Sequence, residues 1–336
     1  MTSIGIVSTG IYIPKKFMTS REIGEKAGIP IKVVEEKMGI VKKPIPAEED
    51  HTCKMGILAA EQALEKANMD AKEIDLIIYI GEEHKEYPLW TAAIYMQQAL
   101  GATNAYCFDM ALRCGTTIMG LKVARDMMVA DENVKTVLLA GGYRNVDYID
   151  YENPRTRFMN NLAAGGGAII LQKGYLENQV LASHIMTDGS FSEDVVVVAG
   201  GTKHPITESA LQQNLNKLDV LDPEGMKMRL EQKSMQNFLY CIRESLRKSS
   251  LTEKDVNYLG ILHMKKSAHD YVLKELGLSN EQSIYLNEYG HIGQIDQILS
   301  LQLAVEKGKV REGDVVVLVS AGIGYAWGAT TIRWGE

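Results

Sequence analysis

Cys114 has the sequence surroundings of a reactive thiol. It lies in the segment YCFDMALRCGTTIMGL, residues 106–121, which predicts a buried strand that turns abruptly into an apolar helix near the cysteine. The N-terminus of a helix carries the positive end of the helix dipole, and a cysteine placed there is stabilised as the nucleophilic thiolate. Cys114 is therefore either a catalytic nucleophile or a small buried side chain, and its partners must decide between the two.

Two histidines are positioned to be such partners, because imidazole is the usual base beside a nucleophilic cysteine. His263 ends the apolar run of residues 258–262, and His291 follows Gly290 in the segment NEYGHIGQ. A histidine that leaves the end of a buried strand is better placed for chemistry than one on a helix face. The other histidines carry less information: His51 and His269 are predicted on a surface helix or loop, and His84, His184 and His204 have no distinctive context.

Metal and redox cofactors are not expected. Cysteines and histidines never fall at the close spacings of a zinc site. The run Gly165-Gly166-Gly167 precedes a predicted strand and does not link a strand to a helix, so it does not predict a dinucleotide-binding turn.

The other cysteines, Cys53, Cys107 and Cys241, lie in the middle of predicted helices or a strand and are interpreted as core residues. Four cysteines without close pairing in 336 residues indicate reduced thiols. The first residues also lack the basic and apolar regions of a secretory signal. We therefore expect a cytoplasmic protein.

Composition and charge fit a soluble globular protein of one large or two smaller domains. Hydrophobic residues make up 46% of the chain and charged residues 24%. Lys and Arg total 36 against 43 Asp and Glu, which gives a net charge of -7. Nucleic-acid-binding proteins usually carry a basic surplus, so a nucleic-acid partner is not expected.

The elements that must hold these side chains follow an α/β pattern. Apolar runs of strand length alternate with helical patterns, which favours mostly parallel sheets covered by helices. A Thr19-x-x-Glu22 capping box marks the start of the first helix. The predicted strands are 4–7, 76–80, 134–140, 168–171, 195–198, 315–319 and 329–333, and the predicted helices are 20–27, 54–67, 90–100, 116–129, 226–249, 268–276 and 294–306.

The stretch from Val315 to Ile332 has 18 residues without a charge, which is near the minimum for a membrane span. It contains Gly322, Gly324 and Gly328. A pair of buried strands explains this composition better than a membrane helix, so no membrane partner is expected.

An internal repeat divides the chain. Residues 61–81 can be laid over residues 243–263 at a constant offset of 182, so that Leu64 falls on Leu246 and Lys66 on Lys248. The segment VLLAGGY, from Val137, falls on LVSAGIGY at a similar offset. Two matches in the same order predict two similar halves, 1–173 and 174–336, with the site where their strand ends converge.

The motifs of the chain resemble those of a known family. They include GIVSTGIYIP, MGIVKK, FDMALRCGTT, LAAGGGAIIL, NEYGHIGQ and GDVVVLVSAGIGYAWGA, in this order. In order and spacing they are similar, nearly end to end, to the motifs of thiolase-superfamily condensing enzymes, above all β-ketoacyl-acyl-carrier-protein synthase III. The resemblance implies a duplicated αβαβα layered sandwich that forms a homodimer.

The resemblance also implies roles for individual residues. Cys114 takes the position of the nucleophile, His263 that of the histidine in an HQAN-like motif, and His291 that of the asparagine in a GNT-like motif. An acyl group would move from a coenzyme A or carrier-protein thioester to Cys114 and then condense with a malonyl-type thioester that loses carbon dioxide, giving a 3-oxoacyl product. The backbone amides of Cys114 and Ile323 would form the oxyanion hole.

Departures from the family pattern leave alternatives open. Glu83 in IGEEH matches the general acid of 3-hydroxy-3-methylglutaryl-CoA synthase, which would imply an aldol reaction, and a non-decarboxylating acyl transfer is a related alternative. An inactive thiolase-fold partner subunit is an alternative of another class.

Arg113 and Tyr87 are candidate substrate-binding residues. Tyr87 lies in a loop that resembles the one relatives extend across their dimer. The arginines near the site predict an acyl group that is short or has a polar or anionic end: Arg113, Arg144, Arg155 and Arg157.

Overall fold

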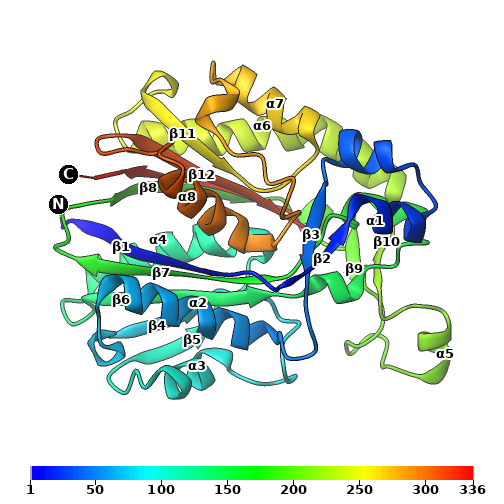
Figure 1. Ribbon diagram of the computed structural model, residues 1–336, viewed down its shortest axis with the longest axis horizontal. Coiled ribbons are helices and arrows are strands. Elements are labelled where there is room, and N and C mark those ends of the chain that lie inside the picture. Colours follow the sequence, from blue (N-terminus) through cyan, green and yellow to red (C-terminus); the bar gives the residue numbers. More distant parts are fainter. Residues whose placement is uncertain (1, 336) are drawn as a thin grey trace.

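The computed structural model describes residues 2–335 and shows one large mixed sheet to which both halves of the chain contribute (Figure 1). Its strand order is β5-β4-β6-β7-β1-β8-β13-β12-β11. The strands are β1 (Ile4–Tyr12), β4 (Leu76–Tyr79), β5 (Tyr106–Asp109), β6 (Thr136–Tyr143), β7 (Gly165–Lys173), β8 (Gln179–Thr187), β11 (Val256–Ile261), β12 (Val315–Gly322) and β13 (Ala326–Arg333).

The sheet has a seam in its middle. β1 and β8 pair only through Gly5 and Gln179, so the strands on either side form two nearly separate parts. Two small ribbons lie outside the sheet: β2 (Lys16–Thr19) with β3 (Lys42–Ile45), and β9 (Val195–Val197) with β10 (Leu218–Val220).

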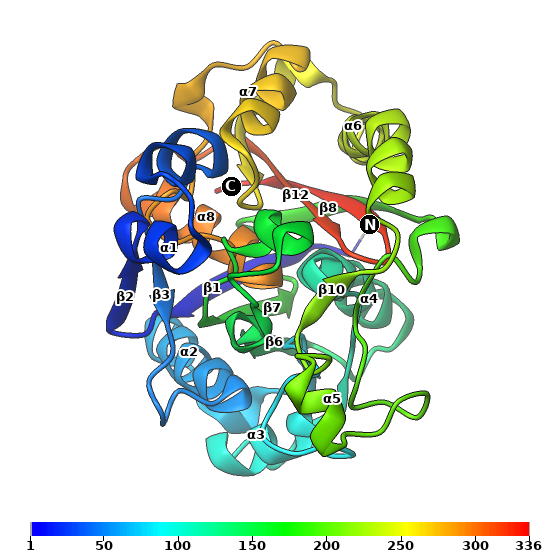
Figure 2. The ribbon, with the colours of Figure 1, turned by 90° about the vertical axis from the view of Figure 1, so that its right-hand side faces the viewer.

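Helices cover both parts of the sheet and fill the space between them. Helices α2 and α3 pack on the first part, α6 and α7 on the second, and α4 and α8 contact strands of both (Figures 1 and 2). This five-layered arrangement confirms the predicted αβαβα sandwich. The helices are α1 (Ser20–Ala27), α2 (Thr52–Ala67), α3 (Ala92–Leu100), α4 (Thr116–Ala130), α5 (Glu208–Gln212), α6 (Pro223–Lys248), α7 (Lys266–Glu275) and α8 (Asp296–Glu306).

The local signals of the sequence explain these elements. The seven predicted helices and seven predicted strands are all present, with bounds that differ by a few residues. The prediction of mostly parallel sheets was wrong: among the strands of residues 2–335, only β4–β5, β4–β6 and β11–β12 pair in parallel, because β7 and β13 run antiparallel to the strands on both of their sides. The capping box forms as predicted, since Thr19 accepts from the Glu22 amide and Glu22 accepts from the Thr19 amide. Strand β4 is buried along its whole length, which explains why it is an unbroken apolar run.

The uncharged stretch from Val315 to Ile332 forms the antiparallel pair of β12 and β13, as predicted. Among residues 2–335, no helix combines the length and apolar character that a membrane crossing requires. The glycine run 165–167 begins β7, where Gly166 lets α2 approach the sheet, because a β-carbon there would lie 2.1 Å from the Met55 carbonyl oxygen.

The order of elements repeats along the chain. The first half contains β1, α2, β4, α3, α4, β6 and β7 in this order, and the second half contains β8, α6, β11, α7, α8, β12 and β13. Strand β5, between α3 and α4, has no counterpart in the described residues between α7 and α8. Gly174, with φ of 81°, begins the turn between β7 and β8. The division into halves at residues 173 and 174 stays a prediction, which this repeated order supports.

Candidate functional site

The nucleophile candidate lies where β5 turns into α4. A short 3-10 helix, Arg113–Gly115, precedes α4, and Arg113 adopts a left-handed backbone with φ of 50°. This conformation is costly for a residue with a side chain and directs the next residue sharply into the helix. Cys114 is buried and lines a cavity of about 620 Å³.

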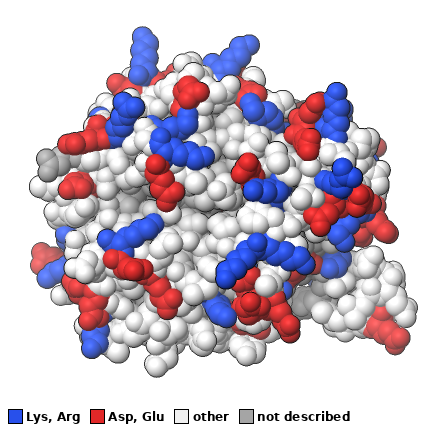
Figure 3. Space-filling view, viewed as in Figure 1, with Lys and Arg blue, Asp and Glu red and all other residues white. Residues whose placement is uncertain are grey.

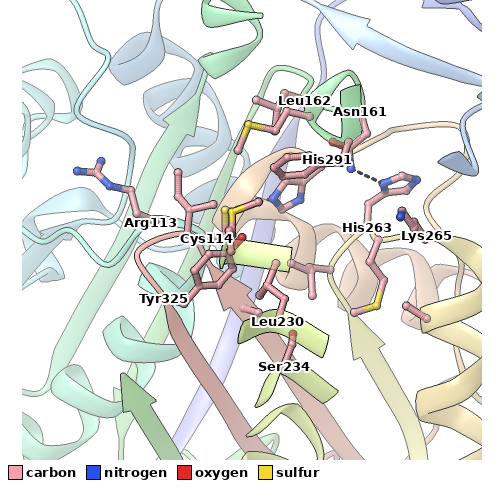
Figure 4. Close-up of a pocket in the computed structure, with 18 of the residues that line it drawn as sticks. Arg113, Cys114, Asn161, Leu162, Leu230, Ser234, His263, Lys265, His291 and Tyr325 are labelled. Atoms are coloured by element: carbon pink, nitrogen blue, oxygen red, sulfur yellow. Dashed lines mark hydrogen bonds between the residues drawn. The ribbon is translucent and has the colours of Figure 1, made fainter. Parts of the chain in front are cut away.

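Cys114 forms a triad with a histidine and a carboxylate of the second half. The Sγ atom of Cys114 lies 3.1 Å from Nε2 of His291, and Nδ1 of His291 donates to Asp296 over 2.6 Å. Figure 4 shows the His291 ring beside the thiol. A thiol, an imidazole and a carboxylate in this order form an activated nucleophile.

The surroundings of His291 favour its charged form. Burial opposes a positive charge on the ring, but the negative charges of Asp296 and Cys114 outweigh burial and raise the pKa of His291 well above its ordinary value. An imidazole that favours its charged form therefore lies 3.1 Å from the sulfur of Cys114.

Asp296 is the first residue of α8 and is fully buried. One of its oxygens accepts from both the His291 ring and the His263 backbone amide, and the other accepts from the amide of Ile292. Its three donors come from the two segments that carry the histidines, so this carboxylate fixes their relative position.

His263 also lines the cavity, but both of its ring nitrogens are bound to the protein. Nε2 lies 3.0 Å from the carbonyl oxygen of Gly39, which can only accept, so Nε2 carries the proton. Nδ1 then accepts from the side-chain amide of Asn161 over 3.0 Å, the bond drawn in Figure 4. Burial lowers the pKa of His263 to about 4, so the ring is neutral.

A buried lysine supports the loop that holds these histidines. Lys43 is fully buried, and its Nζ donates to the carbonyl oxygens of Asn160 and Leu162 over 2.7 Å each. The carbonyl oxygen of the residue between these two, Asn161, accepts from the His291 amide over 2.8 Å. The loop of residues 160–162 thus contacts the backbone of His291 and, through the Asn161 side chain, the ring of His263.

The glycine turn after β12 lies close to the backbone of Cys114, and the oxyanion hole formed by the Cys114 and Ile323 amides stays a prediction. Ser320 at the end of β12 donates to the Cys114 carbonyl oxygen over 2.6 Å. A β-carbon added to Gly322 would lie 3.1 Å from the Cys114 nitrogen, so this glycine turn lies against the start of α4. Ile323 follows it and lines the cavity.

The charged residues near Cys114 are paired with one another: Glu82 and Glu83 both bind Arg113. Glu83, the candidate general acid, has a side chain that is 63% exposed and is bound to Arg113. Its neighbour Glu82 is buried, lines the cavity and binds Arg113 over 3.0 Å. Tyr87 is 65% exposed and lies away from the cavity lining.

Carboxylates of the chain already bind three of the four arginines that suggested an anionic acyl group. Arg113 binds Glu82 and Glu83, while Arg144 binds Asp147 and Arg155 binds Asp219. The walls of the cavity are mainly apolar, and α6 supplies much of them. Its apolar lining residues are Met226, Leu230, Met235 and Phe238.

The other cysteines and histidines lie apart from the triad. Cys53 and Cys241 are buried and Cys107 half-buried, and burial raises the pKa of each thiol. His269 was expected on the surface, and this was wrong: it is buried against Tyr285, because its face of α7 packs inward.

On the face in Figure 3, basic and acidic groups alternate without a large patch of one sign.

Two site residues, Asp296 and Asn161, had no separate signal in the sequence. Asp296 lies five residues after His291, and only the turn between them shows that its side chain returns to the ring. Asn161 contacts His263 across 102 residues.

Family comparisons match both site-bearing parts of the chain. The model for 3-oxoacyl-[acyl-carrier-protein] synthase III matches residues 108–189, and the model for the C-terminal part of 3-oxoacyl-[acyl-carrier-protein] synthase III matches residues 246–334. Cys114 lies in the first range, and both His291 and Asp296 lie in the second.

Individual relatives extend over nearly the whole chain. The β-ketoacyl-[acyl-carrier-protein] synthase III of Symbiobacterium thermophilum is 27% identical over 334 residues, which cover 99% of this chain and 98% of that protein. The same enzyme of Caldanaerobacter subterraneus subsp. tengcongensis is 25% identical over 335 residues, with the same coverage.

Solved structures share the fold. The crystal structure of 3-oxoacyl-[acyl-carrier-protein] synthase III from Aquifex aeolicus superposes with a TM-score of 0.83 at 24% identity and covers 98% of this chain and 100% of that one. The corresponding structure from Pseudomonas aeruginosa gives a TM-score of 0.86 at 18% identity, with 99% of each chain covered.

Proposed function

Since the chain is a thiolase-superfamily acyltransferase of the 3-oxoacyl-[acyl-carrier-protein] synthase III type, we propose that Cys114 takes an acyl group from a thioester and condenses it with a malonyl-type thioester. One observation carries this proposal: Sγ of Cys114, just before α4, lies 3.1 Å from Nε2 of His291. A thiolate held there by an imidazolium can attack a thioester carbonyl without further activation.

In the first half-reaction, the Cys114 thiolate attacks the carbonyl carbon of the acyl thioester. The negative charge that develops on the carbonyl oxygen is stabilised by the amides of Cys114 and Ile323. The C–S bond of the donor then breaks, the donor leaves as a thiolate, and the acyl group remains on Cys114.

In the second half-reaction, a malonyl-type thioester loses carbon dioxide and the electrons of the broken C–C bond form an enolate. The N–H groups of protonated His291 and neutral His263 are the two donors for the enolate oxygen. The ring of His263 must exchange the Gly39 carbonyl for this oxygen. The enolate carbon attacks the acyl carbon, the bond to Sγ breaks, and the Cys114 thiolate is regenerated.

The apolar cavity supports an acyl group without a charged end. The chain's carboxylates occupy Arg113 and Arg155, which line the cavity, while α6 lines it with apolar side chains. We propose an unbranched or branched hydrocarbon acyl group delivered on coenzyme A or on an acyl carrier protein.

A homodimer is also part of the proposal. β5 lies at the edge of the sheet, and exposed apolar side chains gather on it and on the nearby loop and helix α3. Edge strands with such surroundings are usually covered by another chain. The exposed residues are Tyr87, Leu89, Ile94, Tyr95 and Tyr106.

The four free cysteines support a place in the reducing cytoplasm.

Mass spectrometry of the intact protein tests the proposal. Incubation with acetyl-, butanoyl-, hexanoyl- or octanoyl-CoA should add one acyl mass, which peptide mapping should place on Cys114. Addition of malonyl-CoA or malonyl carrier protein should then release carbon dioxide and a 3-oxoacyl thioester. Absence of any adduct on Cys114 contradicts acyl transfer, and an adduct that never releases carbon dioxide contradicts the condensation.

A further inference from the structure

Asp296 determines which nitrogen of His291 faces the thiol. Because the carboxylate of Asp296 accepts from Nδ1, the proton of a neutral His291 ring stays on Nδ1. Nε2, the atom that faces Cys114, then has a lone pair and no proton. The neutral ring is thus a proton acceptor at the reacting centre, which an amide side chain in the same place could not be.

Acylation of Cys114 makes this neutral form easier to reach, while the protonated form remains the donor to the enolate in the condensation. Two negative charges raise the pKa of His291 while the thiolate is free, and only Asp296 remains once the sulfur carries an acyl group. A bare Nε2 would then lie beside the thioester carbon. This is the arrangement in which an imidazole removes a proton from an attacking nucleophile.

We propose that the acyl-enzyme also passes its acyl group to the hydroxyl or amine of a small organic acceptor, with His291 as the general base. The inference rests on the proposed acylation of Cys114 and adds a second fate for the acyl group. The cavity of about 620 Å³, shared by thiol and imidazole, gives room for such an acceptor beside the acyl group.

The step balances without a further reactant. Nε2 takes the proton of the attacking O–H or N–H group as the oxygen or nitrogen forms a bond to the acyl carbon. The amides of Cys114 and Ile323 hold the resulting oxyanion. The C–S bond breaks as this oxyanion collapses, the thiolate of Cys114 leaves, and His291 keeps the proton. An ester or amide is the product, and the thiolate–imidazolium pair is restored.

The groups around His291 make this fate pH-dependent. Asp296 from α8 and Cys114 before α4 contact the ring, Tyr143 of β6 lies 6.0 Å away between ring centres, and His263 shares the Asp296 carboxylate. Burial raises the pKa of Tyr143 and lowers that of His263, so both stay neutral near pH 7. Other titratable groups also line the cavity, among them Glu82, Arg113 and Tyr325.

The test starts from the purified acetyl-enzyme, freed of acetyl-CoA. Ethanolamine, which offers both a hydroxyl and an amine, is added over a series of buffers, and the acetylated product and the loss of the acetyl mass are followed by mass spectrometry. The wild-type acetyl-enzyme should give acetylated ethanolamine at a rate that rises with pH as His291 loses its proton.

His291→Asn tests the general base, because asparagine donates an N–H but cannot take a proton at neutral pH. With each rate taken per mole of acetyl-enzyme present, transfer to ethanolamine should fall by about 10²–10⁴-fold in this variant, and its rate should no longer rise with pH. His184→Asn, a change of the same type on β8 outside the cavity, should behave as wild type.

Transfer to ethanolamine by His291→Asn at the wild-type rate overturns the proposal. So does a wild-type acetyl-enzyme that gives no product with ethanolamine at any pH while it reacts with malonyl-CoA. A protein that never forms the acetyl-enzyme fails before this step, and that outcome counts against the proposed acylation instead.

Discussion

Nδ1 of His291 donates a 2.6 Å hydrogen bond to Asp296, a fully buried carboxylate that also holds the His263 amide. One side chain therefore sets the charge of the imidazole beside the nucleophile and the position of the second histidine.

Asp296→Asn should leave a folded protein with a much slower nucleophile. The substitution keeps the shape of the side chain but removes the charge that raises the pKa of His291. We expect acylation of Cys114 at pH 7 to slow by about 10²–10⁴-fold and to recover partly at higher pH. Stopped-flow measurements with an acyl-CoA give the rate. Asp270→Asn on α7 is the matched control, and equal rates for both variants would contradict the triad.

Iodoacetamide should label Cys114 well before the other three cysteines. The sulfur of Cys114 lies 3.1 Å from Nε2 of His291, whereas burial raises the pKa of Cys241 to about 12 and also raises those of Cys53 and Cys107. Peptide mapping after short exposure at neutral pH measures the order. Cys114→Ala should remain folded and form no acyl adduct, and faster labelling of another cysteine would remove Cys114 from the proposed role.

The two adjacent glutamates should respond differently to substitution. Glu82→Gln removes a buried partner of Arg113, so the free energy of unfolding should fall by about 1–3 kcal/mol. Glu83 is exposed, and Glu83→Gln should change stability by about 0.5 kcal/mol or less and leave condensation intact. If Glu83→Gln instead lowered the rate by about 10²–10⁴-fold, Glu83 would act as a general acid in an aldol reaction.

A larger side chain on α6 should shorten the acyl group that the enzyme accepts. Leu230 lines the cavity, and Leu230→Trp should reduce acylation by octanoyl-CoA at least about tenfold more than acylation by acetyl-CoA. Met228 is on the same helix but is exposed, so Met228→Trp is the control. An unchanged preference in Leu230→Trp would show that the acyl chain lies elsewhere.

The protein should lose stability in mild acid because two histidines are buried without a charge. Burial lowers the pKa of both His263 and His269 to about 4, so the unfolded chain binds more protons between that value and the ordinary 6.5. The contribution of these two neutral histidines to the free energy of unfolding is therefore fully present above about pH 6.5, and it is lost as the pH drops toward 4. Each histidine should contribute a loss of about 2 kcal/mol between pH 7 and pH 5.

Urea unfolding at these two pH values measures the effect. His269→Phe keeps an aromatic ring against Tyr285 and should remove about half of the combined contribution of these two histidines. His204→Phe, at an exposed position, should not change the pH dependence. The same loss in all three proteins would show that other groups dominate acid unfolding.

Local patterns in the sequence predicted most of the helices and strands, and the resemblance to a known family implied the layered fold. Strand β8 was not predicted, because its apolar residues are interrupted by Ser183 and His184. The Thr19–Glu22 box, the apolar run of β4 and the periodicity of α6 each depend on neighbours in the chain. The ribbon of β2 and β3 was not predicted, because its strands are short, lie outside the main sheet and contain Lys16, Lys42 and Pro44.

The site was predicted only as far as its parts have a local signal. Cys114 stands at a strand-to-helix turn and His291 follows a glycine, and both positions can be recognised in the sequence. The roles of Asp296 and Asn161 depend on contacts that only the folded chain makes. The hydrogen bond from the His263 ring to the Gly39 carbonyl oxygen joins residues 224 positions apart, so no local sequence pattern predicts it.

The separation of the triad along the chain has a consequence for biosynthesis. His291 follows Cys114 by 177 residues, and Asp296 comes later still. A ribosome therefore makes the thiol long before it makes the proposed base. Under the proposed mechanism, acyl transfer has to wait until the second half of the chain has been made and has folded against the first.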